Sequence, residues 1–173
     1  GATAKKFARF FVEGEHLLVD GKKMSKALGN IYTLRDLEKR GFDPLVFRYL
    51  VLTSHYRSKL NFTWKSLGAM QKSLEKIRSR ILSPKTPRPL NFKIPAFRDQ
   101  FQKAIFNDLD TPKALAVFWR YFNRLSLTDI LWADKILGLN LSTLKPLNPP
   151  AKIKKLVGNR EKARGAKYWK KAD

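Results

Sequence analysis

Residues 64–81 read WKSLGAMQKSLEKIRSRI, and this stretch decides the fold class. Its large apolar side chains recur at intervals of three, four or seven residues, at Trp64, Leu67, Leu74, Ile77 and Ile81. That spacing places them on one face of an α-helix, while the basic residues of the stretch fall elsewhere on the cylinder. The stretch therefore predicts a long amphipathic helix.

Signals for two shorter helices precede this stretch. Thr33 followed by Asp36 resembles a capping box that opens a helix, and Gly41 is expected to end it. An Asp-Pro pair then predicts a second helix over residues 43–55, because aspartate is a favourable N-cap and proline a favourable first residue. The two short helices are expected to meet at Gly41.

Helix signals continue further along the chain. Proline-rich stretches at residues 83–95 and 144–150 cannot continue a helix, so they indicate linkers. The apolar residues between and after these linkers again have helical spacing. The expected segments begin at Pro95, Thr111, Ile130 and Ala151.

One segment, residues 10–19, resembles a β-strand. We interpret it as the edge of a sheet whose other strands are absent from this chain. The expected fold class is therefore mainly α, with a short strand and a mobile loop, then short helices, then an antiparallel helical bundle.

The charge of the chain favours a polyanionic partner. Among 173 residues, 36 Lys and Arg stand against 14 Asp and Glu, a formal net charge of +22. Hydrophobic residues make up 43%, which is enough to bury a core. A chain this basic repels itself unless a polyanion covers part of its surface, so nucleic acid is the expected partner. Residues 101–150 are nearly balanced in charge and are expected to form the buried middle.

Several classes of protein are excluded by composition. The chain has no cysteine, which rules out a disulfide, a thiol nucleophile and a cysteine-ligated zinc, and it has only two histidines, so we expect no metal site. The longest apolar run, residues 45–52, is far shorter than the roughly 18 to 20 residues of a membrane span. Nothing at the N-terminus resembles a signal peptide, so we expect no membrane contact and a cytoplasmic location.

The segment most informative about function is the lysine loop, residues 18–30, which reads LVDGKKMSKALGN. Gly21 and Gly29 bracket it and allow it to move, so that Lys23 and Lys26 could close together over a polyphosphate. The glycine spacing of a P-loop is absent, so mobile ammonium groups rather than backbone amides would hold the phosphates. The alternative for the four residues KMSK alone is a solvated, lysine-rich turn.

Further motifs follow the lysine loop in a specific order. They are TLRD (residues 33–36), HYRS (55–58), DLDTP (108–112), and a terminal group of Arg160, Ala163, Arg164 and residues 169–173. Together with VDGKKMSK and LGN in the loop, they resemble the C-terminal part of cysteinyl-tRNA synthetases, a family of class I aminoacyl-tRNA ligases. The resemblance covers nearly the whole chain.

The resemblance implies two regions. Residues 1–60 would be the end of the class I catalytic domain, with the KMSK loop and the stem-contact helices. Residues 61–173 would be a helical bundle of the class I anticodon-binding type, truncated at its C-terminus. The family's nucleotide-binding fold, with its His-x-Gly-His signature, and its cysteine-binding zinc site lie upstream and outside this chain. We therefore expect this stretch alone to be catalytically incompetent.

The resemblance also implies an ATP site, with Mg²⁺, at Lys23, Met24, Ser25 and Lys26. Lys26, assisted by Lys23, would be catalytic: it would contact the ATP phosphates and stabilise the charge that grows as the cysteine carboxylate attacks the α-phosphate. Ala27 stands where the family commonly has serine, which removes one hydroxyl but neither lysine charge. The family's zinc ligands are not in this chain.

The expected tRNA contacts fall into two groups. Arg35, Lys39 and Arg40 would rest on phosphates inside the L-shaped tRNA, and the alternative for each is a solvated helix face. The second group would recognise the anticodon of tRNA(Cys), by stacking one base and reading others. Its members are Arg164, Trp169 and Asp173. The alternative for that group is that Trp169 docks the last helix onto the bundle.

Two interpretations concern other motif positions. His55 is expected to be structural, with its imidazole bonding a carbonyl oxygen rather than acting as a base. Phe11 and Glu13 occupy the positions of a Trp-x-His motif that the family often has before the strand.

Three functions are compatible with these observations. The first is a piece of a cysteine-tRNA ligase, acting as a monomer with ATP, cysteine and tRNA(Cys). The second is a free-standing, non-catalytic tRNA- or RNA-binding module. The third is a related cysteine ligase of thiol-cofactor biosynthesis, which would not need the anticodon-type residues Arg164 and Trp169.

Overall fold

The computed structural model describes residues 6–82, 94–145 and 151–165, and this part of the chain is mainly helical. Two 3₁₀ turns, Phe122–Arg124 and Leu141–Thr143, accompany the helices. The elements in chain order are β1 (Leu17–Val19), β2 (Lys22–Lys23), α1 (Leu34–Lys39), α2 (Pro44–Leu52), β3 (Leu60–Phe62), α3 (Trp64–Leu82), α4 (Ile94–Phe106), α5 (Thr111–Tyr121), α6 (Leu127–Leu137) and α7 (Ala151–Gly165). The expected mainly α class is confirmed.

The start of α1 has the capping box that the sequence predicts. The Thr33 hydroxyl accepts a hydrogen bond from the Asp36 amide, and the Asp36 carboxylate accepts one from the Thr33 amide at 2.8 Å. These bonds satisfy amide groups that have no partner inside the helix. Gly41, just after α1, has a φ of 81°, which glycine adopts without strain.

Helix α2 begins as expected but ends early. Asp43 caps it by accepting a hydrogen bond from the Leu45 amide at 2.8 Å, with Pro44 in the first position. The helix stops at Leu52, three residues before the expected end at His55. The reason is tertiary: His55 and the two residues after it bond to a turn more than 50 residues away, as described below.

The small sheet corrects the expectation for the strand. Strand β1 is the middle strand of three, in the order β2-β1-β3, and it covers only Leu17–Val19 instead of residues 10–19. It pairs antiparallel with β2 and parallel with β3. The partners were missed because they contain two and three residues, too few to show an alternating pattern. Phe10 and Phe11 lie outside the strand with exposed rings.

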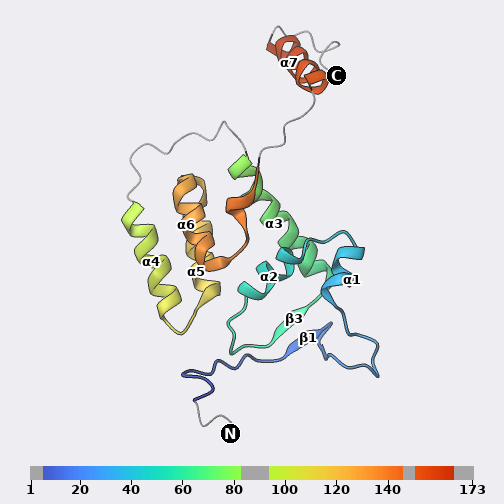
Figure 1. Ribbon diagram of the computed structural model, residues 1–173, viewed down its shortest axis with the longest axis vertical. Helices are drawn as coiled ribbons and strands as arrows, with labels where there is room; N and C mark the ends of the chain where they lie inside the picture. The colour runs from blue at the N-terminus through green and yellow to red at the C-terminus, as the bar shows by residue number, and fades with distance from the viewer. Residues whose placement is uncertain (1–5, 83–93, 146–150, 166–173) are drawn as a thin grey trace.

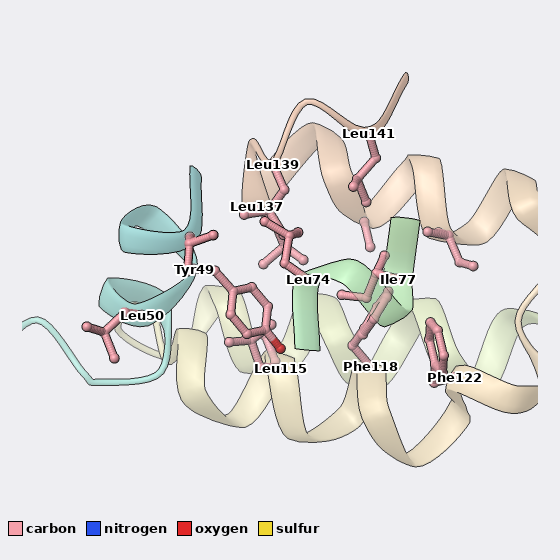
Figure 2. Packing of buried hydrophobic residues seen from close by; sticks show 14 of the residues in the cluster. Tyr49, Leu50, Leu74, Ile77, Leu115, Phe118, Phe122, Leu137, Leu139 and Leu141 are labelled. Atoms are coloured by element: carbon pink, nitrogen blue, oxygen red, sulfur yellow. The ribbon is translucent and has the colours of Figure 1, made fainter. Parts of the chain in front are cut away.

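Helix α3 buries the predicted apolar face. Leu67, Leu74 and Ile77 have no solvent exposure, and Trp64 and Ile81 pack against the core as partly buried residues. Figure 2 shows Leu74 and Ile77 lying among core side chains of the neighbouring helices. Those neighbours include Tyr49 from α2, Leu115 and Phe118 from α5, and Leu137, Leu139 and Leu141 from the end of α6 and beyond.

The segment of balanced charge supplies most of the rest of this core, as expected. Helices α4, α5 and α6 are grouped together, while the small sheet lies next to α1 and α2 (Figure 1). The fully buried aromatic rings come from this group, at Phe97, Phe101 and Phe118. The three starts predicted at Pro95, Thr111 and Ala151 agree with the starts of α4, α5 and α7. The predicted segment from residue 130 is the later part of α6.

Two buried carboxylates stabilise α6. The Asp129 carboxylate accepts hydrogen bonds from the Ser126 hydroxyl, at the start of the helix, and from the Arg98 guanidinium on α4. Asp134 accepts two bonds of 2.7 Å from the amides of Leu139 and Leu141, which follow the helix end. Buried carboxylates are stable only with such partners. These contacts fix α6 against α4 and against the chain that leaves it.

The described helices include none that is both long and apolar enough to cross a membrane. Most of the two proline-rich stretches, at residues 83–93 and 146–150, lies outside the described residues.

Candidate functional site

The lysine loop begins in β1, turns back through β2 and ends shortly before α1. Asp20 and Gly21 turn the chain between β1 and β2 with φ values of 49° and 75°. The Gly21 amide donates to the Asn61 side-chain oxygen on β3 at 2.8 Å. A second turn closes at Gly29, whose φ is 61° and whose amide donates to the Lys26 carbonyl. Both bracketing glycines thus stand where positive φ requires them.

Asn30 closes the loop, a role that the sequence did not reveal. Its side-chain oxygen accepts from the Ser25 amide at 2.8 Å, and its side-chain nitrogen donates to the Lys23 carbonyl at 3.2 Å. The Ser25 hydroxyl accepts from the Leu28 amide at 3.2 Å. Asparagine side chains commonly bond nearby backbone groups in turns, so an asparagine at the loop end was the available signal.

The four predicted ATP-binding residues divide into two pairs. Lys23 and Lys26 are exposed, and neither has an ion pair within the part of the chain that the structure describes. Met24 instead packs against the core and lines an apolar pocket of about 170 Å³ with Tyr32 and Phe47. Ser25 is held by its bonds to Asn30 and Leu28. The arrangement anchors the loop at its middle and leaves both ammonium groups free for an anion.

Three predicted tRNA-contact residues lie on or just after α1. Arg35 and Lys39 are exposed and four residues apart, so they lie on the same side of the helix. Arg40 differs because its guanidinium stacks on the Trp64 ring, 4.0 Å from the centroid, with Tyr32 at 6.0 Å. Its charge is still exposed, but its orientation is fixed by the aromatic rings.

Of the three residues expected to recognise the anticodon, the structure describes one. Arg164 is exposed on α7. Trp169 and Asp173 lie outside the described residues. Recognition of the anticodon by these three side chains therefore stays a prediction.

Two motifs that are far apart in sequence meet at the Asp108 turn, which comprises residues 107–110. The Asp108 carboxylate accepts from the Tyr56 hydroxyl at 2.5 Å and from the Arg57 Nε at 2.8 Å. The Asp108 carbonyl bonds His55 Nε2 at 2.9 Å. Because a carbonyl can only accept, Nε2 donates, and Nδ1 is then free to accept from the Arg57 amide at 3.3 Å. The prediction that His55 bonds a carbonyl is confirmed.

The hydrogen bonds of the Asp108 turn shift the pKa values of the groups that form them. The hydrogen bond from the Tyr56 hydroxyl, followed by that from the Arg57 guanidinium, lowers the pKa of Asp108 below its ordinary 3.8. The same bond to Asp108 raises the pKa of Tyr56 above its ordinary 10.0. Asp108 and Leu109 both have φ of 55°, which is strained for residues other than glycine. This cluster ties the end of α2 to the start of α5 and offers no free group for chemistry.

Within the described residues, no group of three or more histidine, aspartate or glutamate side chains is placed to hold a metal ion. The described surface carries exposed cations, which are lysines of the lysine loop and basic residues on the helices.

Comparison with known proteins shows which families the chain resembles. Residues 1–72 match the family described as tRNA synthetases class I (C) catalytic domain. The cysteine–tRNA ligase of Chlamydia abortus is 38% identical over 192 residues, which cover 96% of this chain and 40% of that protein. Cysteine–tRNA ligase 1 of Burkholderia lata is 37% identical over 181 residues, covering 99% of this chain and 38% of that protein.

A third relative, the cysteine–tRNA ligase of Opitutus terrae, is 38% identical over 174 residues, with 96% of this chain and 37% of that protein covered. The chain is thus similar, over nearly its whole length, to proteins of the class I tRNA synthetases. Within that class, the similarity is to cysteine–tRNA ligases. It spans about two fifths of the length of the curated relatives it matches.

Proposed function

We propose that this chain is the C-terminal portion of a cysteine–tRNA ligase, which activates cysteine with ATP and transfers it to tRNA(Cys). In that reaction it supplies the lysine loop and the tRNA-binding surface. The observation that carries the proposal is the lysine loop, in which Lys23 and Lys26 are exposed and unpaired among the described residues while Met24 is anchored in the core. The names of the relatives point to the same reaction.

The lysines act on the phosphates of ATP. Lys26 contacts them and stabilises the negative charge that develops on the α-phosphate during attack by the cysteine carboxylate, and Lys23 assists. Mg²⁺ bound to ATP supplies further charge neutralisation. Met24 and Ser25 hold the backbone that positions both lysines, through the core contact and the bonds to Asn30. Gly21 and Gly29 let the loop close on the nucleotide and reopen.

The two proposed regions divide the work on tRNA. Residues 1–60 complete the catalytic domain and place Arg35, Lys39 and Arg40 against backbone phosphates. Residues 61–173 form the helical region that approaches the anticodon, where Trp169 stacks on a base and Arg164 and Asp173 read base edges. The net charge of +22 supports the role in RNA binding. We expect the whole to act as a monomer in the cytoplasm.

A chimera tests the proposal. The matching two fifths of the Chlamydia abortus relative is replaced by this chain, and attachment of cysteine to tRNA(Cys) is measured. We expect an active chimera, whereas this chain alone should bind tRNA but show no cysteine-dependent pyrophosphate exchange above a Lys26→Ala control.

The same measurements separate the other functions. A folded, inactive chimera together with strong tRNA binding by the chain alone would favour the free-standing RNA-binding module. Cysteine-dependent exchange by the chimera without tRNA affinity in the chain would favour the ligase of thiol-cofactor biosynthesis.

A further inference from the structure

Three lysines form a straight stripe along the solvent side of α3. Lys65, Lys72 and Lys76 are all exposed and are separated by seven and four residues. At 3.6 residues per turn these positions lie within about 40° of one another around the helix, and they span about 16 Å along its axis. We call these three residues the lysine track. It was not among the expected tRNA contacts.

The core fixes the direction in which the lysine track points. Leu67 and Leu74 have no solvent exposure and lie about 160° to 180° around the helix from the track. The three lysines therefore leave the helix on the side opposite to Leu67 and Leu74, along a helix of 19 residues. The same face also carries two small residues, Ala69 between the lysines and Ser79 one turn beyond Lys76, so a flat, regular partner can approach closely.

The contacts of Lys76 show that one cation of the track is pre-oriented. Its ammonium lies 5.6 Å from the Trp119 ring centroid and 5.9 Å from that of Phe122. The Trp119 ring is itself fixed, because its Nε1 donates to the Tyr49 hydroxyl at 2.6 Å and Tyr49 is buried. Such cation–π contacts orient a charge without neutralising it.

The other two lysines are not engaged by the protein. Lys65 and Lys72 have no ion pair or side-chain hydrogen bond to any residue that the structure describes. The one acidic residue of α3, Glu75, lies to the side of the track and accepts a hydrogen bond from Gln71 at 2.9 Å. Three exposed like charges in a row are self-repelling, and an anion of regular spacing would relieve that repulsion.

Both ends of α3 extend the positive surface. At the start, the Arg40 guanidinium stacks on Trp64, next to Lys65, and Figure 1 shows α1 beside this end of α3. Near the other end, the Arg80 guanidinium lies 5.3 Å from the Phe122 ring centroid and donates to the Leu125 carbonyl at 3.0 Å. Arg40, one of the expected tRNA contacts, thus stacks on the residue that precedes the first lysine of the track.

We propose that the lysine track binds the phosphate backbone of RNA, as a contact surface at the start of the helical region. This inference rests on the proposed tRNA-binding function and names a further surface for it. A lipid surface fits poorly, because the face lacks the large apolar residues that membrane-surface helices insert. Contacts of this kind position the RNA and carry no base preference.

The test compares two triple variants of this chain with the same change in net charge. The first is K65Q/K72Q/K76Q, which removes the track. The matched control is K103Q/K113Q/K135Q, which removes one exposed lysine from each of α4, α5 and α6. Glutamine keeps the helix propensity of these positions. Affinity for tRNA(Cys) is measured by fluorescence anisotropy at several salt concentrations, and circular dichroism checks the fold.

We expect the track variant to reduce the slope of log K against log salt by about two units, since each lost phosphate contact contributes about 0.7 to 0.9. The control should leave that slope nearly unchanged. An unrelated RNA duplex should show the same loss with the track variant, because backbone contacts do not read sequence.

Each other outcome overturns the inference in a distinct way. Equal losses in the two variants, with the parent binding tRNA well, refute the track but leave the proposed function intact. A parent that binds no tRNA refutes both. A loss confined to tRNA(Cys) refutes a backbone contact, and an equal loss of binding to poly(glutamate) would assign the track to acidic peptides.

Discussion

The lysine loop and the Asp108 turn both reverse the chain with residues at positive φ, yet they treat charge in opposite ways. The lysine loop is held by short-range bonds through Asn30, and Lys23 and Lys26 are left without ion pairs among the described residues. In the Asp108 turn, the carboxylate and the carbonyl of Asp108 are both engaged, by partners 51 to 53 residues away.

That difference separates the site that we propose to act on a ligand from a site that stabilises the fold. A charge already paired inside the protein has little left to offer a ligand, whereas an exposed ammonium on an anchored loop keeps its full interaction energy for a phosphate. The Asp108 turn stabilises the junction between α2 and α5. The lysine loop is the part expected to change conformation, because the bonds made by Asn30 are local. The core contact of Met24 and the bond from the Gly21 amide to Asn61 keep the loop attached while it moves.

The largest effect should come from Lys26. In the chimera, Lys26→Ala should lower kcat about 100- to 1000-fold, the usual cost of losing one charge-stabilising group. The matched control is Lys22→Ala, which removes an exposed lysine from the adjacent strand β2. Steady-state aminoacylation kinetics measure both. Equal losses in the two variants would mean that general positive charge matters and that the loop lysine has no special role.

The next largest effect should come from Asn30, whose side chain holds the lysine loop in shape. Asn30→Ala removes two hydrogen bonds, each of which typically contributes about 0.5 to 1.5 kcal/mol, so kcat should fall roughly tenfold. The melting temperature should hardly change, because both bonds lie within the loop. The exposed Asn123→Ala is the control. A large drop in melting temperature for Asn30→Ala would show that the loop is part of the fold's stability.

Local signals in the sequence predicted most helices but not their contacts. The capping box at Thr33 and the Asp43-Pro44 start are complete within four residues of chain, and the apolar period of α3 repeats over five turns. Each of these patterns indicates its helix from a short stretch of sequence alone. The junction of Tyr56 and Arg57 with Asp108 has no such local signal. Neither motif has any periodicity, and the partners are 51 or 52 residues apart.

The candidate site was predictable to a similar extent. The lysines and glycines of the loop follow from its sequence, and the structure shows the two lysines exposed and the glycines at positive φ. The spacing of the lysine track is itself a local helical pattern. The anchoring of Met24 and the stacking of Arg40 on Trp64 depend instead on how the folded elements pack. That packing is a property of the folded chain, so no local pattern could indicate it.

Asp108→Asn should weaken the bonds of the Asp108 turn to Tyr56 and Arg57 and leave the lysine loop unchanged. We expect a lower melting temperature, because an amide cannot accept from both Tyr56 and Arg57 as the carboxylate does, while asparagine tolerates the positive φ of this position. The control is Asp99→Asn, which loses a single exposed pair with Lys103 and should have little effect. Similar drops for both variants would contradict a special role of Asp108.

The pH dependence of that difference has a definite sign. The pKa of Asp108 is lowered in the fold, so its contribution to stability is present above the unfolded pKa of about 3.9 and is lost as the pH falls through the lowered value. The gap in melting temperature between the parent and Asp108→Asn should therefore be constant at neutral pH and shrink below about pH 4. Thermal melts at a series of pH values measure it.

The smallest effect concerns the positive φ that the two sites share. Leu109 has a φ of 55° in the Asp108 turn, and Gly29 has 61° in the lysine loop with open space around it. At ordinary sites alanine is more stable than glycine by about 0.5 to 1 kcal/mol, but at positive φ the Cβ atom costs about 1 to 2 kcal/mol. Leu109→Gly should therefore be more stable than Leu109→Ala by up to about 1 kcal/mol, and Gly29→Ala should be destabilised by a similar amount. Both are read from urea unfolding curves. If Leu109→Ala proves the more stable of its pair, the Asp108 turn relaxes out of the left-handed region in solution, and the backbone likeness between the two sites fails.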